Sequence, residues 1–178
     1  MPPSDPVGAG PFAGGCQCGA VRFRAESLGR ASICHCRMCQ KATGGFFGAY
    51  VTGRNVSWTR GAPSYFLSSN KVRRGFCGTC GTPLTFEQLD GLPPGQVELS
   101  IAAFDDPAVA APVVQVNLEG KLAFADHLAD LPTIVEPPSW TAFKAAIVSH
   151  QHPDHDTDTW PPENLPPENL PPKDGFAA

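Results

Sequence analysis

The stretch Cys77-Gly78-Thr79-Cys80-Gly81 decides how this 178-residue chain is expected to fold. It is typical of a zinc knuckle, a tight turn in which the closing glycine accepts unusual backbone angles and nearby amides point at thiolate sulfur. Much earlier in the chain, Cys16-Gln17-Cys18-Gly19 ends in a glycine in the same way. A structural zinc takes four closed tetrahedral ligands. We therefore expect one ion to tie an early strand to a later one, held by Cys16, Cys18, Cys77 and Cys80.

A third cluster, Cys34-His35-Cys36-Arg37-Met38-Cys39, lies between these two pairs. Its three thiols, close together in one loop, could occupy one face of a metal ion and leave the fourth position open, as catalytic zinc sites do. We therefore expect two Zn²⁺ per chain, one structural and one catalytic, the second held by Cys34, Cys36 and Cys39. His35 is expected to support these ligands or to face solvent.

The spacing of the cysteines leaves other arrangements open. A single zinc could combine Cys77 and Cys80 with two central cysteines and leave Cys16 and Cys18 as redox thiols. Ordinary buried cysteines without a metal are a weaker interpretation. Seven cysteines cannot all pair as disulfides, and tight thiol clusters in a reducing compartment indicate metal.

The segments around the cysteine clusters predict a mainly β domain. Residues 20–24 alternate apolar and basic side chains, and similar short runs follow, most with Gly, Pro, Asn or Ser near their ends. The further expected strands are residues 46–51, 56–58, 65–67, 97–101 and 113–118. We expect twisted, folded-over antiparallel sheets held by zinc over residues 12–132, after a flexible leader of residues 1–11.

One C-terminal helix is expected within residues 133–150. Ser139 can cap a run over residues 140–149, in which apolar side chains recur at helical spacing. The stripe consists of Trp140, Phe143, Ala146 and Ile147. We expect it to pack on the outside of the domain.

Residues 151–178 are expected to form a Pro-rich, acidic tail, either mobile or docked. Residues 161–165 and 166–170 both have the sequence Pro-Pro-Glu-Asn-Leu, and such proline-rich sequences favour extended polyproline conformations. The histidines and acids of residues 150–156 look like a metal-binding patch, but we expect a polar segment that binds metal only adventitiously.

Charge and hydropathy exclude several classes of protein. The formal charge is −4, but residues 150–178 hold six acids and one Lys, so the first 149 residues carry about +1. A body without a basic surplus argues against a nucleic-acid partner. No apolar run approaches the ~18 residues of a membrane span, and residues 1–5 lack the parts of a signal peptide. We therefore expect no membrane partner and a cytoplasmic location.

Together with their neighbours, the three cysteine motifs resemble the glutathione-dependent formaldehyde-activating enzyme family, which shares its domain with centromere protein V. The segments that carry the resemblance are residues 15–23 (Gly-Cys-Gln-Cys-Gly-Ala-Val-Arg-Phe), 34–44 (Cys-His-Cys-Arg-Met-Cys-Gln-Lys-Ala-Thr-Gly) and 76–84 (Phe-Cys-Gly-Thr-Cys-Gly-Thr-Pro-Leu). The resemblance covers roughly residues 12–132. It implies twisted β-sheets with little helix and the same division into a structural and a catalytic zinc.

The activity that the resemblance implies is the reversible condensation of glutathione with formaldehyde to S-(hydroxymethyl)glutathione, a carbon–sulfur lyase reaction. A glutathione-like thiol and formaldehyde are the expected partners, and a homo-oligomer is left open. Glutathione has two carboxylates, so basic residues near the thiols could clamp it, although exposed basic residues are more often solvated. Water or the Thr43 hydroxyl could relay a proton. The candidate substrate-binding residues are Arg37, Lys41, Thr43 and Arg73, with Lys71 and Arg74 nearby.

The sequence excludes one competing function and leaves another open. A zinc nucleobase deaminase needs a His-x-Glu motif before Pro-Cys-x-x-Cys, and this chain has neither. A non-catalytic zinc-binding protein-interaction module stays open, because centromere protein V shares the domain.

The chain departs from the family pattern in one stretch. The family usually has a His-containing strand and a Trp near the end of the domain, where this chain has Val-Gln-Val-Asn at 114–117 and Lys-Leu-Ala-Phe-Ala at 121–125.

Overall fold

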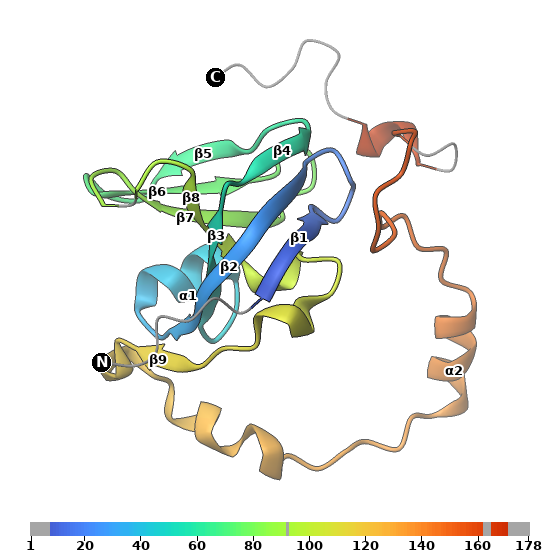
Figure 1. The fold of residues 1–178 in the computed structure, drawn as a ribbon. Coiled ribbons are helices and arrows are strands. Elements are labelled where there is room, and N and C mark those ends of the chain that lie inside the picture. The colour runs from blue at the N-terminus through green and yellow to red at the C-terminus, as the bar shows by residue number, and fades with distance from the viewer. Residues whose placement is uncertain (1–7, 92, 162–164, 171–178) are drawn as a thin grey trace.

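The computed structural model describes residues 8–91, 93–161 and 165–170, and these residues form a mainly β architecture (Figure 1). One sheet runs in the order β1-β2-β3-β8-β7-β6-β5, and β4 and β9 pair with β2 off this path. Every pair is antiparallel except β2 with β9, which confirms the expected fold class. The strands are β1 (Gly8–Gly15), β2 (Arg22–Cys34), β3 (Gly48–Arg54), β4 (Ser57–Arg60), β5 (Ser64–Leu67), β6 (Val72–Phe76), β7 (Pro83–Gln88), β8 (Gln96–Ser100) and β9 (Val114–Val116).

Few helices accompany the sheet. The α-helices of the described residues are α1 (Arg37–Thr43) and α2 (Pro138–Ala145). The short 3₁₀ helices are η1 (Ile101–Ala103), η2 (Pro107–Ala110), η3 (Leu118–Gly120), η4 (Ala123–Asp130) and η5 (Pro167–Asn169). Among the helices of the described residues, none combines the length and the apolar character that crossing a membrane requires.

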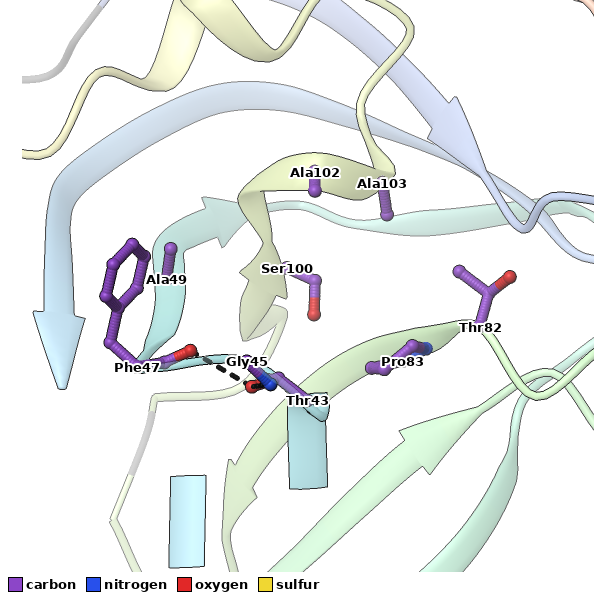
Figure 2. Close-up of a pocket in the computed structure, with 9 residues that line it drawn as sticks. All are labelled: Thr43, Gly45, Phe47, Ala49, Thr82, Pro83, Ser100, Ala102 and Ala103. Atoms are coloured by element: carbon purple, nitrogen blue, oxygen red, sulfur yellow. Dashed lines mark hydrogen bonds between the residues drawn. The ribbon is translucent and has the colours of Figure 1, made fainter. Parts of the chain in front are cut away.

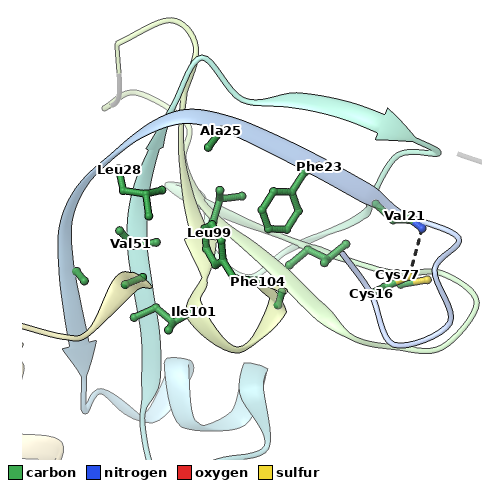
Figure 3. Packing of buried hydrophobic residues seen from close by; sticks show 14 of the residues in the cluster. Cys16, Val21, Phe23, Ala25, Leu28, Val51, Cys77, Leu99, Ile101 and Phe104 are labelled. Carbon is green, nitrogen blue, oxygen red and sulfur yellow. Dashed lines mark hydrogen bonds between the residues drawn. The ribbon is translucent and has the colours of Figure 1, made fainter. Parts of the chain in front are cut away.

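Strand β2 joins the parts of the sheet because its 13 residues are enough to pair with four other strands. Its first half pairs with β1 and β4, and its second half pairs with β3 and β9. The register with β3 shifts between Leu28 and Ala31. A bulge of this kind bends a strand and increases its twist. As a result β2 arches over the buried side chains (Figure 3).

The core lies under this arch and continues into the cysteine turns. Its largest fully buried side chains are Phe23, Leu28, Leu84, Leu99, Val51 and Cys77. Each large apolar side chain buried in this way contributes about 1.5–3 kcal/mol relative to exposure. Cys16 and Cys18 belong to the same cluster. The four-cysteine turns are therefore anchored on the core.

The central cysteine segment is not the single loop that the sequence suggested. Cys34 ends β2, Cys36 is the N-cap residue of α1, and Cys39 lies inside that helix. The Cys36 sulfur accepts a hydrogen bond from the backbone N–H of Cys39 at 3.4 Å. Gly44, with φ 66°, ends α1 in the left-handed conformation that favours glycine. This helix was missed because cysteine is not a usual N-cap residue.

The sequence also missed three strands. β6 carries no clear apolar alternation, whereas β7 does alternate apolar and polar side chains, so its sequence held a strand signal. β1 starts at Gly8, so residues 8–11 are not part of a leader. Because β1 lies at the edge of the sheet, it tolerates Gly and Pro, and its register shifts between Ala9 and Phe12. Residues 1–7 of the expected leader lie outside the described residues.

The C-terminal helix differs from its prediction. α2 begins at Pro138, so Ser139 lies inside the helix and is not its cap. Trp140, Phe143 and Ile147 are exposed by 52%, 69% and 58%, and Ala146 is exposed as well. The expected apolar stripe therefore does not pack on the domain, and α2 stands apart from the sheet (Figure 1).

After α2 the chain returns to the domain and docks on it. The Trp160 indole N–H donates to the carbonyl oxygen of Cys18 at 2.7 Å, and Asp156 pairs with the buried Arg22 at 2.8 Å. In the second Pro-Pro-Glu-Asn-Leu copy, η5 forms a short helical turn, which corrects the polyproline prediction there. Part of the first copy, residues 162–164, lies outside the described residues.

Candidate metal centres

Four sulfur atoms converge where the turn before β2 meets the turn after β6. The ligand atoms of Cys16, Cys18, Cys77 and Cys80 all lie within 4.8 Å of one another. The Sγ–Sγ distance is 3.6 Å from Cys16 to Cys18 and 3.8 Å from Cys18 to Cys77. A tetrahedral zinc with Zn–S bonds of about 2.3 Å separates its sulfur ligands by about 3.8 Å. These thiols therefore fit a closed zinc site, and the cluster could hold a metal ion.

The backbone of both turns is shaped by glycine. Gly19 and Gly81 have φ values of 75° and 76°, a conformation that glycine adopts at no steric cost. The backbone N–H of Val21 donates to the Cys16 sulfur at 3.2 Å. An amide that points at sulfur stabilises a thiolate, as expected for a metal ligand.

The pKa values of these four thiols indicate that the cluster is suited to bind a cation. Hydrogen bonds from Cys16 and Cys18 lower the pKa of Cys77 to about 6. The hydrogen bond between Cys18 and Cys16, followed by those to the other two thiols and by burial, raises the pKa of Cys18. Without a positive charge, some thiols in the cluster must keep their protons so that others can ionise. A divalent ion would remove that conflict.

The second cluster consists of Cys34, Cys36 and Cys39, whose ligand atoms also lie within 4.8 Å of one another. Among the described residues, no such group joins Cys77 and Cys80 with a central cysteine, so the single mixed zinc considered from the spacing is wrong. The two clusters are those expected from the sequence, and each could hold a metal ion. Their structural and catalytic roles stay predictions.

The three-cysteine cluster borders a groove of about 260 Å³, and both Cys34 and Cys39 line it. Burial raises the pKa of Cys39 to about 12, against the opposing effect of Arg74. For Cys36 burial acts in the same upward direction, but the N–H of Cys39 and further hydrogen bonds outweigh it and lower the pKa. The helix cap thus prepares Cys36 to be a thiolate.

A buried guanidinium supports this cluster. Arg74 is only 6% exposed, and its Nη2 donates to the Cys39 sulfur at 3.4 Å while Nη1 donates to the Tyr50 hydroxyl at 3.1 Å. Its Cζ lies 5.1 Å from the centre of the Phe86 ring. The cation therefore lies against the Cys39 sulfur and would stabilise its thiolate form, because charge-assisted hydrogen bonds are strong away from water.

The stretch that departs from the family pattern also contacts the cysteines. Asn117 donates from Nδ2 to the Cys34 sulfur at 3.1 Å, and Gln115 Oε1 lies 2.8 Å from Nε2 of His35. The parallel pairing of β9 with β2 brings both residues there. His35 is 2% exposed, so the alternative that it faces solvent is wrong, and its Nδ1 has no hydrogen-bond partner in the described part of the chain.

The residues predicted to bind substrate do not line the groove. They are Arg37, Lys41, Thr43 and Arg73. Arg37 reaches Gln40 at 3.3 Å, and Arg73 pairs with Glu87 at 2.6 Å. The Thr43 hydroxyl lies 3.0 Å from the carbonyl oxygens of both Cys39 and Phe47. Their substrate contacts stay predictions.

A second cavity of about 240 Å³ lies between the end of α1, β3 and η1 (Figure 2). Its lining is largely apolar, and Thr43 and Ser100 are among its polar members. The Ser100 hydroxyl is buried without a hydrogen-bond partner among the described residues and points into the cavity (Figure 2). No cysteine lines this cavity, so we place the chemistry at the groove instead.

The histidine-rich segment after α2 does not gather into a metal cluster. His152 is buried, with its Nε2 at 3.1 Å from the Thr157 hydroxyl and 3.2 Å from Nη1 of Arg60. Asp156 is engaged by Arg22 and Arg24. Within the described ranges, the two cysteine clusters are the only groups found that could hold a metal ion.

The comparisons with known proteins agree with the cysteine motifs. The family model of the glutathione-dependent formaldehyde-activating enzyme matches residues 11–119, a range that contains all seven cysteines and extends past β9. No curated protein matches the chain.

Proposed function

The chain belongs to the glutathione-dependent formaldehyde-activating enzyme family, and from this membership we propose that it joins a glutathione-like thiol to formaldehyde and separates them in the reverse direction. In this carbon–sulfur lyase-type reaction, the thiol sulfur bonds to the carbonyl carbon and the thiol proton ends on the hydroxymethyl oxygen. The product is S-(hydroxymethyl)glutathione, and no oxidant or reductant is needed. The observation that carries the proposal is a three-cysteine cluster that borders a groove.

A Zn²⁺ held by Cys34, Cys36 and Cys39 would supply a position at which the substrate thiol loses its proton. The protein's own part is to hold the three thiolates. Asn117 donates to Cys34 and Arg74 donates to Cys39, so two of the three sulfur atoms are fixed from outside the cluster. The Arg74 cation also offsets the negative charge that three thiolates bring together.

The proton of the hydroxymethyl oxygen needs a donor in the groove, and we assign this role to Tyr50. Its side chain lines the groove together with Cys34 and Cys39 and is 5% exposed. The Tyr50 oxygen accepts a hydrogen bond from Arg74, which leaves its own proton to donate. Burial raises the pKa of Tyr50 to about 12, so the hydroxyl stays protonated at neutral pH and can share its proton with a developing alkoxide.

The same proposal includes the location and the second metal. All seven cysteines are free, and a reducing compartment such as the cytoplasm keeps such thiols available for metal. The four-cysteine cluster would hold a structural Zn²⁺ that contributes to folding.

Zinc stoichiometry measured together with thiol binding tests the proposal. We expect two zinc ions per chain and an adduct of glutathione with ¹³C-formaldehyde that forms, by NMR, faster than without protein. Cys36→Ser should lose the rate enhancement, and metal-depleted protein reloaded with zinc should regain it. If a fully loaded protein neither binds glutathione nor accelerates the reaction, the enzyme assignment fails and a non-catalytic zinc-binding interaction module is favoured.

A further inference from the structure

The groove beside the three-cysteine cluster extends along the sheet to a second, charged end. In an antiparallel sheet, directly paired residues project to the same face. Glu98 of β8 is paired with Thr52 of β3 and with Phe86 of β7, so the three side chains share one face. All three line the groove, together with Arg30 of β2.

Glu98 is a fixed carboxylate without a cation bound to it. Its Oε1 accepts a hydrogen bond from the Thr52 hydroxyl at 2.6 Å. Burial raises the pKa of Glu98, and the hydrogen bond from Thr52 and the charge of Arg30 oppose this effect only in part. In the described part of the chain no ion pair involves Glu98. A ligand cation would therefore find a desolvated carboxylate that has no charge partner to displace.

Arg30 supplies the opposite charge at the same end of the groove. It is exposed, and among the described residues it too forms no ion pair. The two charges are thus near enough to influence each other, yet more than ion-pair distance separates them. Such a gap suits a ligand that carries an ammonium and a carboxylate on one carbon atom.

We propose that Glu98 and Arg30 form the subsite for the α-amino-acid head group of the substrate thiol, with the ammonium on Glu98 and the carboxylate on Arg30. This inference rests on the proposed function and adds to it the part of the substrate that is recognised. The γ-glutamyl end of glutathione carries both groups on one carbon, whereas simple thiols and cysteinylglycine lack this end.

The spacing agrees with that ligand. Cys34 of β2 is paired with Gly48 of β3, and Thr52, which holds Glu98, lies four residues further along β3. Four residues of strand span about 13 Å. A thiol held beside the cysteines at the sulfur–sulfur spacing of a tetrahedral zinc site begins about 4 Å from them, and a γ-glutamyl-cysteinyl unit, comparable to two or three extended residues, reaches about 7–10 Å further. The head group of such a thiol can therefore lie at Glu98.

The experiment uses zinc-loaded full-length protein and S-methylglutathione, which keeps the γ-glutamyl head group but has no free thiol. Calorimetric titration should show saturable binding to the wild type, and Glu98→Gln and Arg30→Met should each weaken it about 10- to 100-fold, the range for a hydrogen bond to a charged group. The Glu98→Gln side chain can still accept from Thr52, so the fold is expected to persist. Glu26→Gln, an exposed glutamate of β2 that does not line the groove, is the matched control and should bind normally.

A second probe separates the two charges. Glutathione acetylated on its α-amino group should bind the wild type 10- to 100-fold more weakly than glutathione, and Glu98→Gln should remove that preference. Failure of S-methylglutathione to bind the wild type, or equal binding by all variants, overturns the subsite. If the adduct still forms in that case, the proposed function stands without the subsite. If binding depends on Glu98 and Arg30 but no protein accelerates the adduct, the subsite stands and the proposed function fails.

Discussion

Replacing Arg74 with methionine should weaken zinc binding at the three-cysteine cluster and leave the four-cysteine cluster unchanged. The substitution removes a buried cation that donates to the Cys39 sulfur at 3.4 Å and keeps most of the side-chain length. A hydrogen bond to a charged group contributes about 1.5–3 kcal/mol, and about 1.4 kcal/mol corresponds to tenfold in affinity. Loss of groups that orient metal ligands typically costs 10- to 100-fold in metal affinity. We therefore expect zinc affinity to fall by about 10- to 100-fold at one of two sites.

Competition with a chromogenic chelator measures this effect, because the weaker site releases its zinc first. Arg73→Met is the matched control, since Arg73 is 42% exposed, pairs with Glu87 and does not contact a cysteine. Surface pairs of this kind contribute about 0–1 kcal/mol, so zinc release should not change. The zinc affinity of Arg74→Lys should lie between those of the wild type and Arg74→Met, because lysine keeps the charge but not the planar guanidinium. Equal release from Arg74→Met and Arg73→Met, or a loss at the four-cysteine site, would refute the assignment of Arg74.

Three further results are expected. Cys77→Ser should leave little folded protein, because structural zinc contributes on the order of 10 kcal/mol to small metal domains, whereas Cys36→Ser should stay folded without turnover; a normal melting temperature for Cys77→Ser, or insoluble Cys36→Ser, would reverse the two roles. Tyr50→Phe should keep both zinc ions and thiol binding but lower the catalysed rate by about 10²- to 10⁴-fold, and an unchanged rate would remove Tyr50 as proton donor. Hydrogen bonding to Arg22 lowers the pKa of Asp156 although burial opposes it, so its contribution to stability is complete above the ordinary carboxyl pKa of about 3.9 and is lost as pH falls through the lowered value. Asp156→Asn should therefore lower the melting temperature at pH 7, and its difference from the wild type should shrink as the pH falls; identical pH profiles would exclude the contact as a source of stability.

The cysteine clusters could be predicted because the signal of each motif is local. A glycine after Cys18 and another after Cys80 mark the positive φ that each turn requires, and these turns occur as expected. The mainly β class followed from short apolar runs bounded by turn residues. The turns and the fold class do not depend on which strands become neighbours, and both were confirmed. The meeting of Cys18 with Cys77, 59 residues later, does depend on the fold.

The supports of the cysteines could not be predicted, because strand pairing decides them. Arg73 and Arg74 are adjacent on β6, and alternation places them on opposite faces without saying which face is buried. The pairing of Arg74 with Phe86 on β7 settles the question. Asn117 contacts Cys34 only because β9 pairs in parallel with β2, and neither segment has a sequence signal that predicts this pairing.

The tail shows why composition alone misjudges such segments. Its proline-rich, acidic sequence cannot form a hydrophobic core of its own. Even so, Leu165 is only 8% exposed, and Trp160 donates a hydrogen bond to the carbonyl oxygen of Cys18. A Cβ at Gly19 would collide with the ring of His152, so this glycine serves both the cysteine turn and the docked tail. The tail therefore packs against the turn that carries the candidate metal ligands Cys16 and Cys18. A low-complexity composition predicts that a segment lacks its own core, but not that it has no surface to join.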